Sequence, residues 1–110
     1  MTGPDLDLLQ GTLDLLVLKA LTFGPRHGYA VVQWVRDTTD DDLQIQEGAL
    51  YTALHRMEKH GWLASQWGLS DNNRKAKYYQ LSAAGRRQLR HESERWARYA
   101  RAVFKVLQTA

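Results

Sequence analysis

The amino-acid sequence predicts a mainly α-helical domain with one small β-hairpin. Three observations lead to this fold class. Apolar side chains recur every three or four residues in three segments before Gly61, which is the pattern of helices that bury one face. After Gly61 the period changes to two, which is typical of strands joined by a turn. Helical spacing then returns over residues 83–107. The predicted order is three helices, two strands and one long helix.

The composition excludes several classes of protein. A chain of 110 residues that is 44% hydrophobic and 25% charged suits one compact domain rather than a disordered chain. It contains no cysteine, which excludes disulfides, thiolate metal sites and a cysteine nucleophile. No apolar run approaches the ~18 residues of a membrane span, and no basic segment precedes the apolar N-terminal region as in a signal peptide. We therefore expect a cytoplasmic protein that is neither secreted nor embedded in a membrane.

The first helix is predicted over residues 8–22. The apolar positions that share its inner face are Leu9, Leu13, Leu16, Val17, Ala20 and Leu21. Leu8, Leu15 and Leu18 fall on other faces, so the helix is apolar almost all round. In so short a chain, a second apolar face indicates contact with a partner subunit.

Two further helices follow after short breaks. Gly24 and Pro25 end the first helix, and a second is predicted over residues 27–38 with three valines on one side. An acidic turn separates it from a third helix, predicted over residues 47–60. The inner stripe of this third helix consists of Leu50, Ala53, Leu54 and Met57. Gly61 follows it, at the position where helices often end in the left-handed conformation.

The hairpin and the last helix complete the chain. The runs "WLASQWGL" and "AKYYQL" are predicted strands, and the turn formers of "SDNNRK" join them. Ser82 is a good N-cap for a helix over residues 83–107. One face of this helix is rich in arginine, and the opposite face carries Leu89, Trp96, Tyr99, Ala100, Val103, Val106 and Leu107. Three of these apolar residues are seven apart, which is the spacing of helices that pair.

Charge is distributed unevenly along the chain. Residues 1–50 hold 3 lysines and arginines against 8 aspartates and glutamates, net −5, whereas residues 51–110 hold 12 against 4, net +8. A basic half of this kind suits an anionic partner such as nucleic acid, but a solvated basic helix gives the same count. The hairpin turn leaves the same choice open, because Arg74, Lys75 and Lys77 either face water or contact a polyanion.

The order of elements is that of a winged helix-turn-helix with a C-terminal dimerisation helix, and four segments resemble the PadR-like family of transcriptional regulators. "GTLDLLVLKAL" and "HGYAVVQWV" are similar to the family's first two helices, and "GALYTALHRMEKHGWL" is similar to its recognition helix. "KAKYYQLSAAGRRQL" is similar to its second wing strand and the start of its last helix. The four segments stand in the family's order and spacing over about residues 9–96.

The resemblance implies a homodimer that binds double-stranded DNA, usually as a repressor on an inverted-repeat operator. Its recognition helix would enter the major groove, and its hairpin, the wing, would contact the DNA beside it. The implied organisation is a winged-helix DNA-binding domain over residues 1–82 and a dimerisation helix over residues 83–110, within one compact unit. The residues predicted to contact DNA are Gln46, Gly48, Ala49, Tyr51, Thr52, His55 and Arg56 on the recognition helix, and Arg74, Lys75, Lys77 and Tyr78 on the wing.

The residue types at these positions support the interpretation independently. The outward face of the third helix offers hydrogen-bond donors and acceptors, a methyl surface and cations, which base edges and phosphates require. Two points stay open. Tyr51 is either a half-buried packing residue or a phosphate contact. Tyr78 and Tyr79 point to opposite sides of their strand, and the family resemblance favours Tyr78 as the DNA-side residue, although a shift of one position would exchange them.

The dimer interface is predicted to join the last helix to the first helix of the partner. Its predicted residues are Leu8, Leu15, Leu89, Trp96, Tyr99, Val103 and Leu107. The resemblance also implies that a small planar effector binds at the interface near a tryptophan in some relatives. Trp96 is the candidate for this role and Trp34 is the second choice, the alternative being that both only pack. The arginine face of the last helix either faces water or contacts DNA.

Three positions depart from the family pattern. Ala49 stands where Thr is usual, Thr52 where Pro is usual, and Gln46-Glu47 where Ser-Pro is usual, so the base preference is expected to differ. The sequence leaves two alternative functions: a winged-helix module for protein assembly that binds no DNA, and an enzyme. The sequence offers no carboxylate pair, no nucleophile with a base and no phosphate-binding loop. It therefore predicts no catalytic residue, no cofactor and no metal site.

Overall fold

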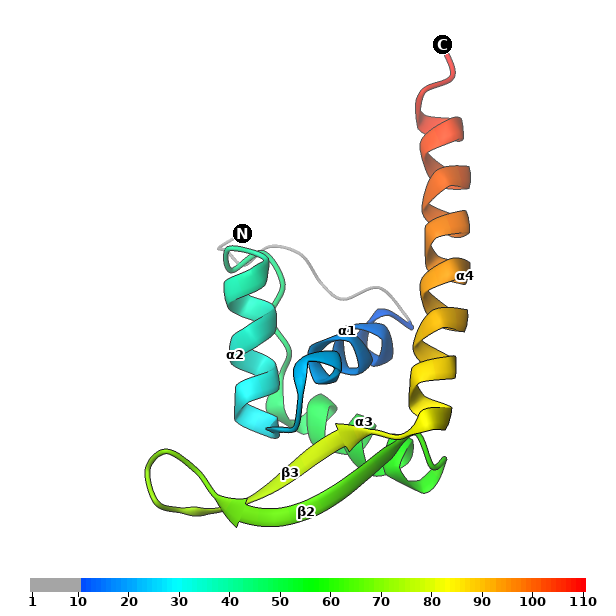
Figure 1. Ribbon diagram of the computed structural model, residues 1–110. Helices are drawn as coiled ribbons and strands as arrows, with labels where there is room; N and C mark the ends of the chain where they lie inside the picture. Colours follow the sequence, from blue (N-terminus) through cyan, green and yellow to red (C-terminus); the bar gives the residue numbers. More distant parts are fainter. Residues whose placement is uncertain (1–10) are drawn as a thin grey trace.

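The computed structural model describes residues 11–110 as four α-helices and a small antiparallel sheet (Figure 1). The elements in chain order are α1 (Thr12–Ala20), the 3-10 turn η1 (Leu21–Phe23), β1 (Arg26–His27), α2 (Gly28–Thr38), α3 (Glu47–Lys59), β2 (Leu63–Leu69), β3 (Lys75–Leu81) and α4 (Ala83–Leu107). The predicted fold class, mainly α-helical with a hairpin and a long last helix, is confirmed. Among these residues, no helix has the length and apolar character that crossing a membrane requires.

The first helix is shorter than its predicted range of residues 8–22. α1 begins at Thr12, after Gly11 in the left-handed conformation with φ of 85°. At its C-terminal end the helix tightens into the 3-10 turn η1, which Gly24 and Pro25 follow directly. The α-helix stops here because neither of these two residues favours its continuation. Residues 8–10 lie outside the described residues, and the predicted interface residue Leu8 lies outside them as well.

A third strand, β1, is missing from the sequence prediction. Arg26 pairs with Tyr79 and His27 with Tyr78, so the sheet has the order β1-β3-β2 instead of being a simple hairpin. A strand of two residues is too short to produce a period in the sequence. β1 can be identified only from its pairing with β3, which is distant in the chain.

The core lies between the first three helices and one face of the sheet. α3 contributes Leu50, Leu54 and Met57, and each of these side chains is fully buried, as the inner stripe predicts. Tyr79 and Leu81 of β3 cover the core from the sheet side. Burial of an apolar side chain of this size contributes about 1.5–3 kcal/mol. The stripe therefore fixes which way α3 is rotated, and with it which side chains face solvent.

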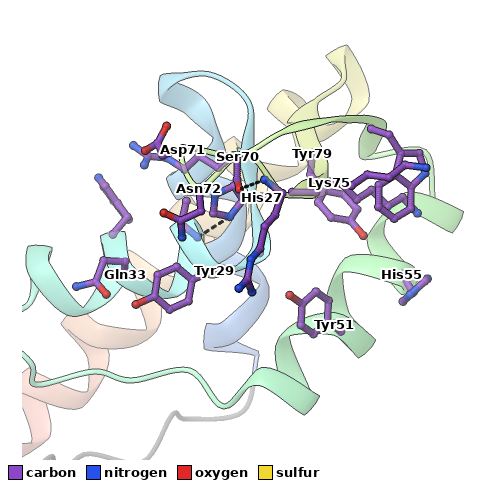
Figure 2. A pocket seen from close by; sticks show the side chains of 18 of the residues that line it. His27, Tyr29, Gln33, Tyr51, His55, Ser70, Asp71, Asn72, Lys75 and Tyr79 are labelled. Atoms are coloured by element: carbon purple, nitrogen blue, oxygen red, sulfur yellow. Dashed lines mark hydrogen bonds between the residues drawn. The ribbon is translucent and has the colours of Figure 1, made fainter.

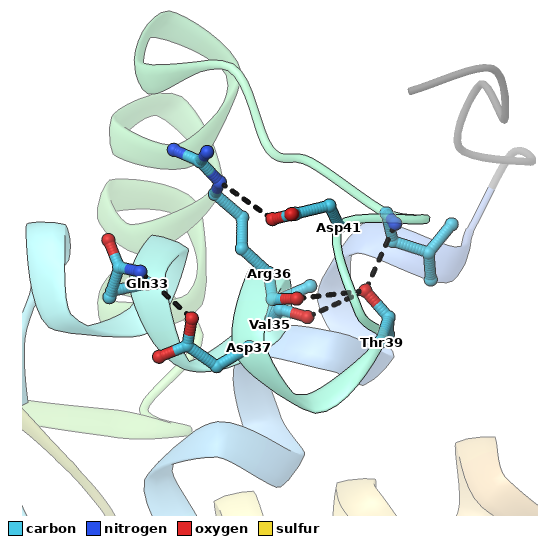
Figure 3. A network of polar contacts seen from close by, with 7 residues as sticks. Gln33, Val35, Arg36, Asp37, Thr39 and Asp41 are labelled. Carbon is cyan, nitrogen blue, oxygen red and sulfur yellow. Dashed lines mark hydrogen bonds and ion pairs between the residues drawn. The ribbon is translucent and has the colours of Figure 1, made fainter. Parts of the chain in front are cut away.

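The acidic turn between α2 and α3 is held by Thr39. Its Oγ1 donates to the carbonyl oxygen of Val35 at 2.8 Å and accepts a hydrogen bond from the backbone N–H of Leu43 at 3.0 Å (Figure 3). The Nε atom of Arg36 lies 3.6 Å from a carboxylate oxygen of Asp41, which has a positive φ that Asp tolerates better than most residues. These contacts set the path by which the chain enters α3.

α4 is joined to the rest of the molecule at its N-terminal end. The Oγ atom of Ser82 accepts from the N–H of Gly85 at 3.0 Å, as predicted for an N-cap, and donates to the carbonyl oxygen of Gly61 at 2.5 Å. Gly85 lies against the backbone of Trp62, where a β-carbon would stand 2.1 Å from the Trp62 carbonyl oxygen. α4 packs against α1, and its C-terminal part extends away from the core (Figure 1).

Replacing Gly85 by alanine should destabilise the fold, because the added methyl group would overlap the Trp62 carbonyl group. We expect a loss of roughly 1–3 kcal/mol in the free energy of unfolding, measured by urea denaturation. Gly48→Ala is the matched control, since a methyl group at this helical glycine meets nothing within 4 Å. Equal losses in both variants, or no loss at Gly85, would contradict the close-approach explanation.

Candidate nucleic-acid interface

α3 presents a second face to solvent. The predicted contact residues on this face are all exposed, and they are Gln46, Gly48, Ala49, Tyr51, Thr52, His55 and Arg56. They point outward because Leu50 and Leu54 are buried on the other side of the helix. The Oγ1 atom of Thr52 donates to the carbonyl oxygen of Gly48 at 3.0 Å. Its methyl group and its acceptor lone pairs therefore remain for an outside partner.

A groove of about 1030 Å³ lies between α2, α3 and the hairpin. Tyr51 and His55 of α3 form one part of its wall, and Lys75 of the hairpin lies across from them (Figure 2). Tyr29 and Gln33 of α2 face the hairpin turn at the other end. The lining therefore combines aromatic, amide and cationic side chains on one concave surface. Within residues 11–110, no group of three or more acidic or histidine side chains is arranged to hold a metal ion.

Tyr51 packs within this groove and remains accessible. A β-carbon added to Gly28 would lie 3.0 Å from the Tyr51 hydroxyl oxygen, so the ring rests directly on the backbone at the start of α2. The side chain is still 44% exposed. Both interpretations of Tyr51 from the sequence thus have an observation behind them: the ring is held by packing, and a large part of it faces the groove.

The hairpin turn carries the most accessible cations of the groove. Arg74 and Lys75 are exposed, next to Asn73 in the left-handed conformation with φ of 60°. The Lys75 Nζ atom lies 5.3 Å from the centre of the Trp67 ring, which is the distance of a cation–π contact. Trp67 is itself 59% exposed. The turn therefore offers two cations and one aromatic surface.

Lys77 is less accessible than the cations of the turn because a carboxylate holds it. Its Nζ atom lies 3.4 Å from Glu58 Oε1 of α3 and 5.5 Å from the centre of the Tyr79 ring. Ser65 Oγ of β2 donates to Glu58 Oε2 at 2.5 Å, and this hydrogen bond, with the charge of Lys77, holds the pKa of the Glu58 carboxyl below its ordinary value of 4.5. Glu58 thus ties α3 to both β2 and β3.

Strand alternation places Tyr78 and Tyr79 on opposite faces of β3. Tyr79 is buried in the core, and this burial raises the pKa of its phenol. Tyr78 lies on the other face, where its hydroxyl donates to the carbonyl oxygen of Leu69 at 2.9 Å and its ring meets His27 edge-on at 5.3 Å. Lys75, Lys77 and Tyr79 line the groove, and Tyr78 does not. The structure thus does not bring Tyr78 together with α3.

Arg56 is engaged within the chain. Its guanidinium donates to both carboxylate oxygens of Asp14 on α1, at 2.8 and 2.7 Å. These hydrogen bonds raise the pKa of the Arg56 guanidinium. Of the cations predicted to contact DNA, Arg56 and Lys77 are therefore each paired with a carboxylate, whereas no ion pair within residues 11–110 involves Arg74 or Lys75.

Several groove residues were missed by reasoning from the sequence. Trp67 lines the groove opposite α3, and Tyr29, Gln33 and Arg26 line it from α2 and β1. A signal existed for Trp67, because the two-residue period of β2 puts it on the same face as Ser65, which contacts α3. No such signal existed for the others, since their position depends on how the hairpin turn lies across α2.

The apolar face of α4 remains uncovered along its outer half. Trp96, Tyr99, Val103 and Leu107 are all exposed, and Leu107 is 70% exposed. The other two predicted interface residues within residues 11–110, Leu15 on α1 and Leu89 on α4, are half-buried. The two candidate effector tryptophans lie on different elements: Trp96 on α4, and Trp34 on α2 beside Phe23, with 5.7 Å between ring centres.

Comparison with known proteins gives consistent matches. The model of the transcriptional regulator PadR-like family matches residues 17–91. An uncharacterized protein from Lysinibacillus sphaericus is 30% identical over 91 residues, which cover 83% of this chain and 84% of that protein. Both matches span α3 and the hairpin.

Solved structures agree in fold. A PadR family transcriptional regulator from Eggerthella lenta is 35% identical with a TM-score of 0.78, and the match covers 92% of this chain and 86% of that one. A transcriptional regulator from Clostridium thermocellum is 28% identical with a TM-score of 0.79, over 87% of this chain and 90% of that one. A PadR family transcription regulator from Clostridium difficile is 26% identical with a TM-score of 0.75, and the match covers 88% of this chain and 99% of that one.

The contacts of Glu58 predict a pH-dependent contribution to stability. Because its folded-state pKa lies below the ordinary 4.5, the ionised carboxylate stabilises the fold at neutral pH, and this contribution is lost as pH falls below 4.5 through the folded pKa. Urea denaturation should therefore show Glu58→Gln less stable than the unmodified protein at pH 7 and nearly equal to it well below pH 4. Glu94→Gln, at an exposed site on α4, is the control and should change little at either pH. A difference that persists unchanged into acid would contradict the assignment.

Proposed function

The chain belongs to the PadR-like family of transcriptional regulators, and on this premise we propose that it is a homodimer that binds an inverted-repeat operator and represses transcription by covering a promoter. Members of this family are transcriptional regulators and not enzymes. The observation that carries the proposal is the shape of the groove. An exposed helix face stands beside a cationic hairpin, as recognition of a DNA duplex requires.

The outward face of α3 reads base edges in the major groove. Gln46 and His55 supply hydrogen-bond donors and acceptors, and Ala49 and the Thr52 methyl group supply apolar surface for a thymine methyl group. Thr52 can only accept a further hydrogen bond from a base, since its proton is engaged by Gly48. Glu47 suits the N-terminal end of the helix dipole, and near DNA it can accept a hydrogen bond from a cytosine amino group.

The wing binds the sugar–phosphate backbone through its turn. Arg74 and Lys75 displace condensed counterions from the phosphates. Trp67, which lies against Lys75, offers an apolar surface to the deoxyribose rings of the DNA. Lys77 contributes less net charge, because Glu58 lies 3.4 Å away. Tyr51 holds its position on Gly28 and presents its hydroxyl toward a phosphate.

The dimer forms through the uncovered apolar face of α4 and the first helix of the partner. An apolar stripe with tryptophan and tyrosine at its centre suits burial between two copies of a helix. Twofold symmetry then presents two copies of α3 to successive major grooves, about 34 Å apart. Trp96 lies within this stripe, where a small planar effector could stack on it and alter the spacing of the two copies.

Binding to DNA upstream of the protein's own gene tests the proposal directly. Affinity should be measured over a salt series, with unrelated DNA of equal length as the comparison. We expect specific binding of two chains per site, with an affinity that falls steeply as salt rises. Weak association that ignores both sequence and salt would instead support a module for protein assembly.

Replacing Arg74 and Lys75 together by alanine should weaken binding to operator and unrelated DNA alike. The plot of log affinity against log salt should become shallower by about 0.9 for each phosphate that the wing no longer neutralises, because fewer counterions are released. The control is the pair Arg98→Ala and Arg101→Ala, which removes the same charge from an exposed stretch of α4. An equal effect of both pairs would mean that net charge alone, rather than the wing, drives binding.

Val103→Glu should dissociate the dimer, since it places an unpaired carboxylate within the apolar stripe of both copies. We expect the dissociation constant, measured by sedimentation equilibrium, to rise by at least about tenfold, which corresponds to ~1.4 kcal/mol. Arg101→Glu on the opposite face of α4 is the control. Should Val103→Glu leave the mass unchanged, the α4 stripe is not the interface.

A further inference from the structure

The ion pair between Asp14 and Arg56 joins the first helix to the recognition helix. Arg56 Nη1 donates to Asp14 Oδ2 at 2.8 Å, and Nη2 donates to Oδ1 at 2.7 Å. It is the shortest ion pair within residues 11–110, and the two residues are 42 positions apart in the chain. A guanidinium that meets both oxygens of a carboxylate fixes orientation as well as distance.

Stability alone is a weak reason for this pair. The side chains of Arg56 and Asp14 are 45% and 24% exposed, so water screens their attraction and the pair adds little to the free energy of unfolding. The core already holds α3 in place through Leu50, Leu54 and Met57. The Asp14–Arg56 pair instead restrains the solvent-facing side of α3, which the buried stripe of α3 does not contact.

The position of Asp14 gives the pair a second consequence. α1 packs against α4 as well as against α3, and α4 carries the uncovered apolar stripe. Arg56 lies directly after His55 and one helical turn after Thr52, both of which face outward. A chain of direct contacts thus runs from α4 through α1 and Asp14 to the exposed face of α3.

The same geometry changes the role of Arg56. Its two terminal nitrogens each donate to Asp14, and the carboxylate offsets its positive charge. A phosphate would have to compete with a carboxylate that is already in place. Arg56 is thus better suited to hold α3 than to bind the DNA backbone.

We propose that Asp14 is a positioning residue for DNA recognition, which sets the orientation of α3 through Arg56 and so links the α4 side of the protein to the base-reading surface. This inference rests on the proposed function for its DNA readout. Asp14 touches no base and no phosphate. Its effect is on specific binding, where small errors in the placement of α3 matter, more than on non-specific binding.

Four variants test this role: Asp14→Asn, Arg56→Gln, Arg56→Lys and the exchanged pair Asp14→Arg with Arg56→Asp. The three single changes should each weaken operator binding roughly two- to thirtyfold, the range expected for residues that act without touching the ligand. The salt slope and the affinity for unrelated DNA should stay the same. The exchanged pair should recover part of the operator affinity, because it rebuilds the ion pair with reversed charges.

Glu94→Gln is the matched control. It removes the same charge from an exposed site on α4, away from the Asp14–Arg56 pair and from the turn that leads into α3. It should leave operator affinity unchanged. Tighter operator binding by Asp14→Asn, or a salt slope lowered by about 0.9 in Arg56→Gln, would overturn the proposal by making Arg56 a phosphate contact that Asp14 inhibits.

Hydrogen exchange in the absence of DNA separates this inference from the proposed function. Amides of residues 47–59 should exchange several times faster in Asp14→Asn than in the unmodified protein, while those of β2 and β3 should keep their rates. Unchanged exchange in α3 would overturn the positioning role whether or not the protein binds DNA. Faster exchange together with an absence of specific DNA binding by the unmodified protein would keep the positioning of α3 and reject the operator-binding function.

Discussion

The burial of one stripe of α3 is the constraint on which the rest of the structure depends. Leu50, Leu54 and Met57 have no contact with water, and turning this face of the helix away from the core would expose them at a cost of several kcal/mol. The packing therefore fixes which face of α3 meets the core. Ala49, Tyr51, Thr52 and His55 are displayed outward as a consequence of this packing. The hairpin packs against the same core and lies beside them across the groove.

Charge pairing then decides which cations remain for an outside partner. Asp14 and Glu58 each neutralise a basic residue next to the groove, whereas the hairpin turn keeps Arg74 and Lys75 exposed. The positive net charge of the second half of the chain thus overstates the charge at the groove, because much of it lies on α4. In the proposed complex, affinity for DNA would rest on Arg74 and Lys75 of the hairpin turn. Asp14 holds α3 to α1, and Glu58 holds α3 to the hairpin.

Strong periodicity explains what the sequence could predict. The inner stripe of α3, the N-cap Ser82 and the apolar face of α4 follow from spacing and cap chemistry alone, and the structure places them as predicted. β1 was not predicted, because its two residues form a strand only through their pairing with β3, which is distant in the chain. The pairing of Arg56 and the placement of Tyr78 outside the groove depend on contacts or register between distant segments, which a single sequence does not encode locally.

The distance between the two copies of α3 in the proposed dimer tests the central claim most directly. The chain contains no cysteine, so Ala49→Cys provides one spin label per protomer at the exposed start of α3. Pulsed electron paramagnetic resonance on the labelled protein without DNA should give one distance distribution centred near 34 Å, one turn of B-form DNA. The absence of any distance between labels, or a distribution centred tens of ångströms away from one helical turn, would contradict the account.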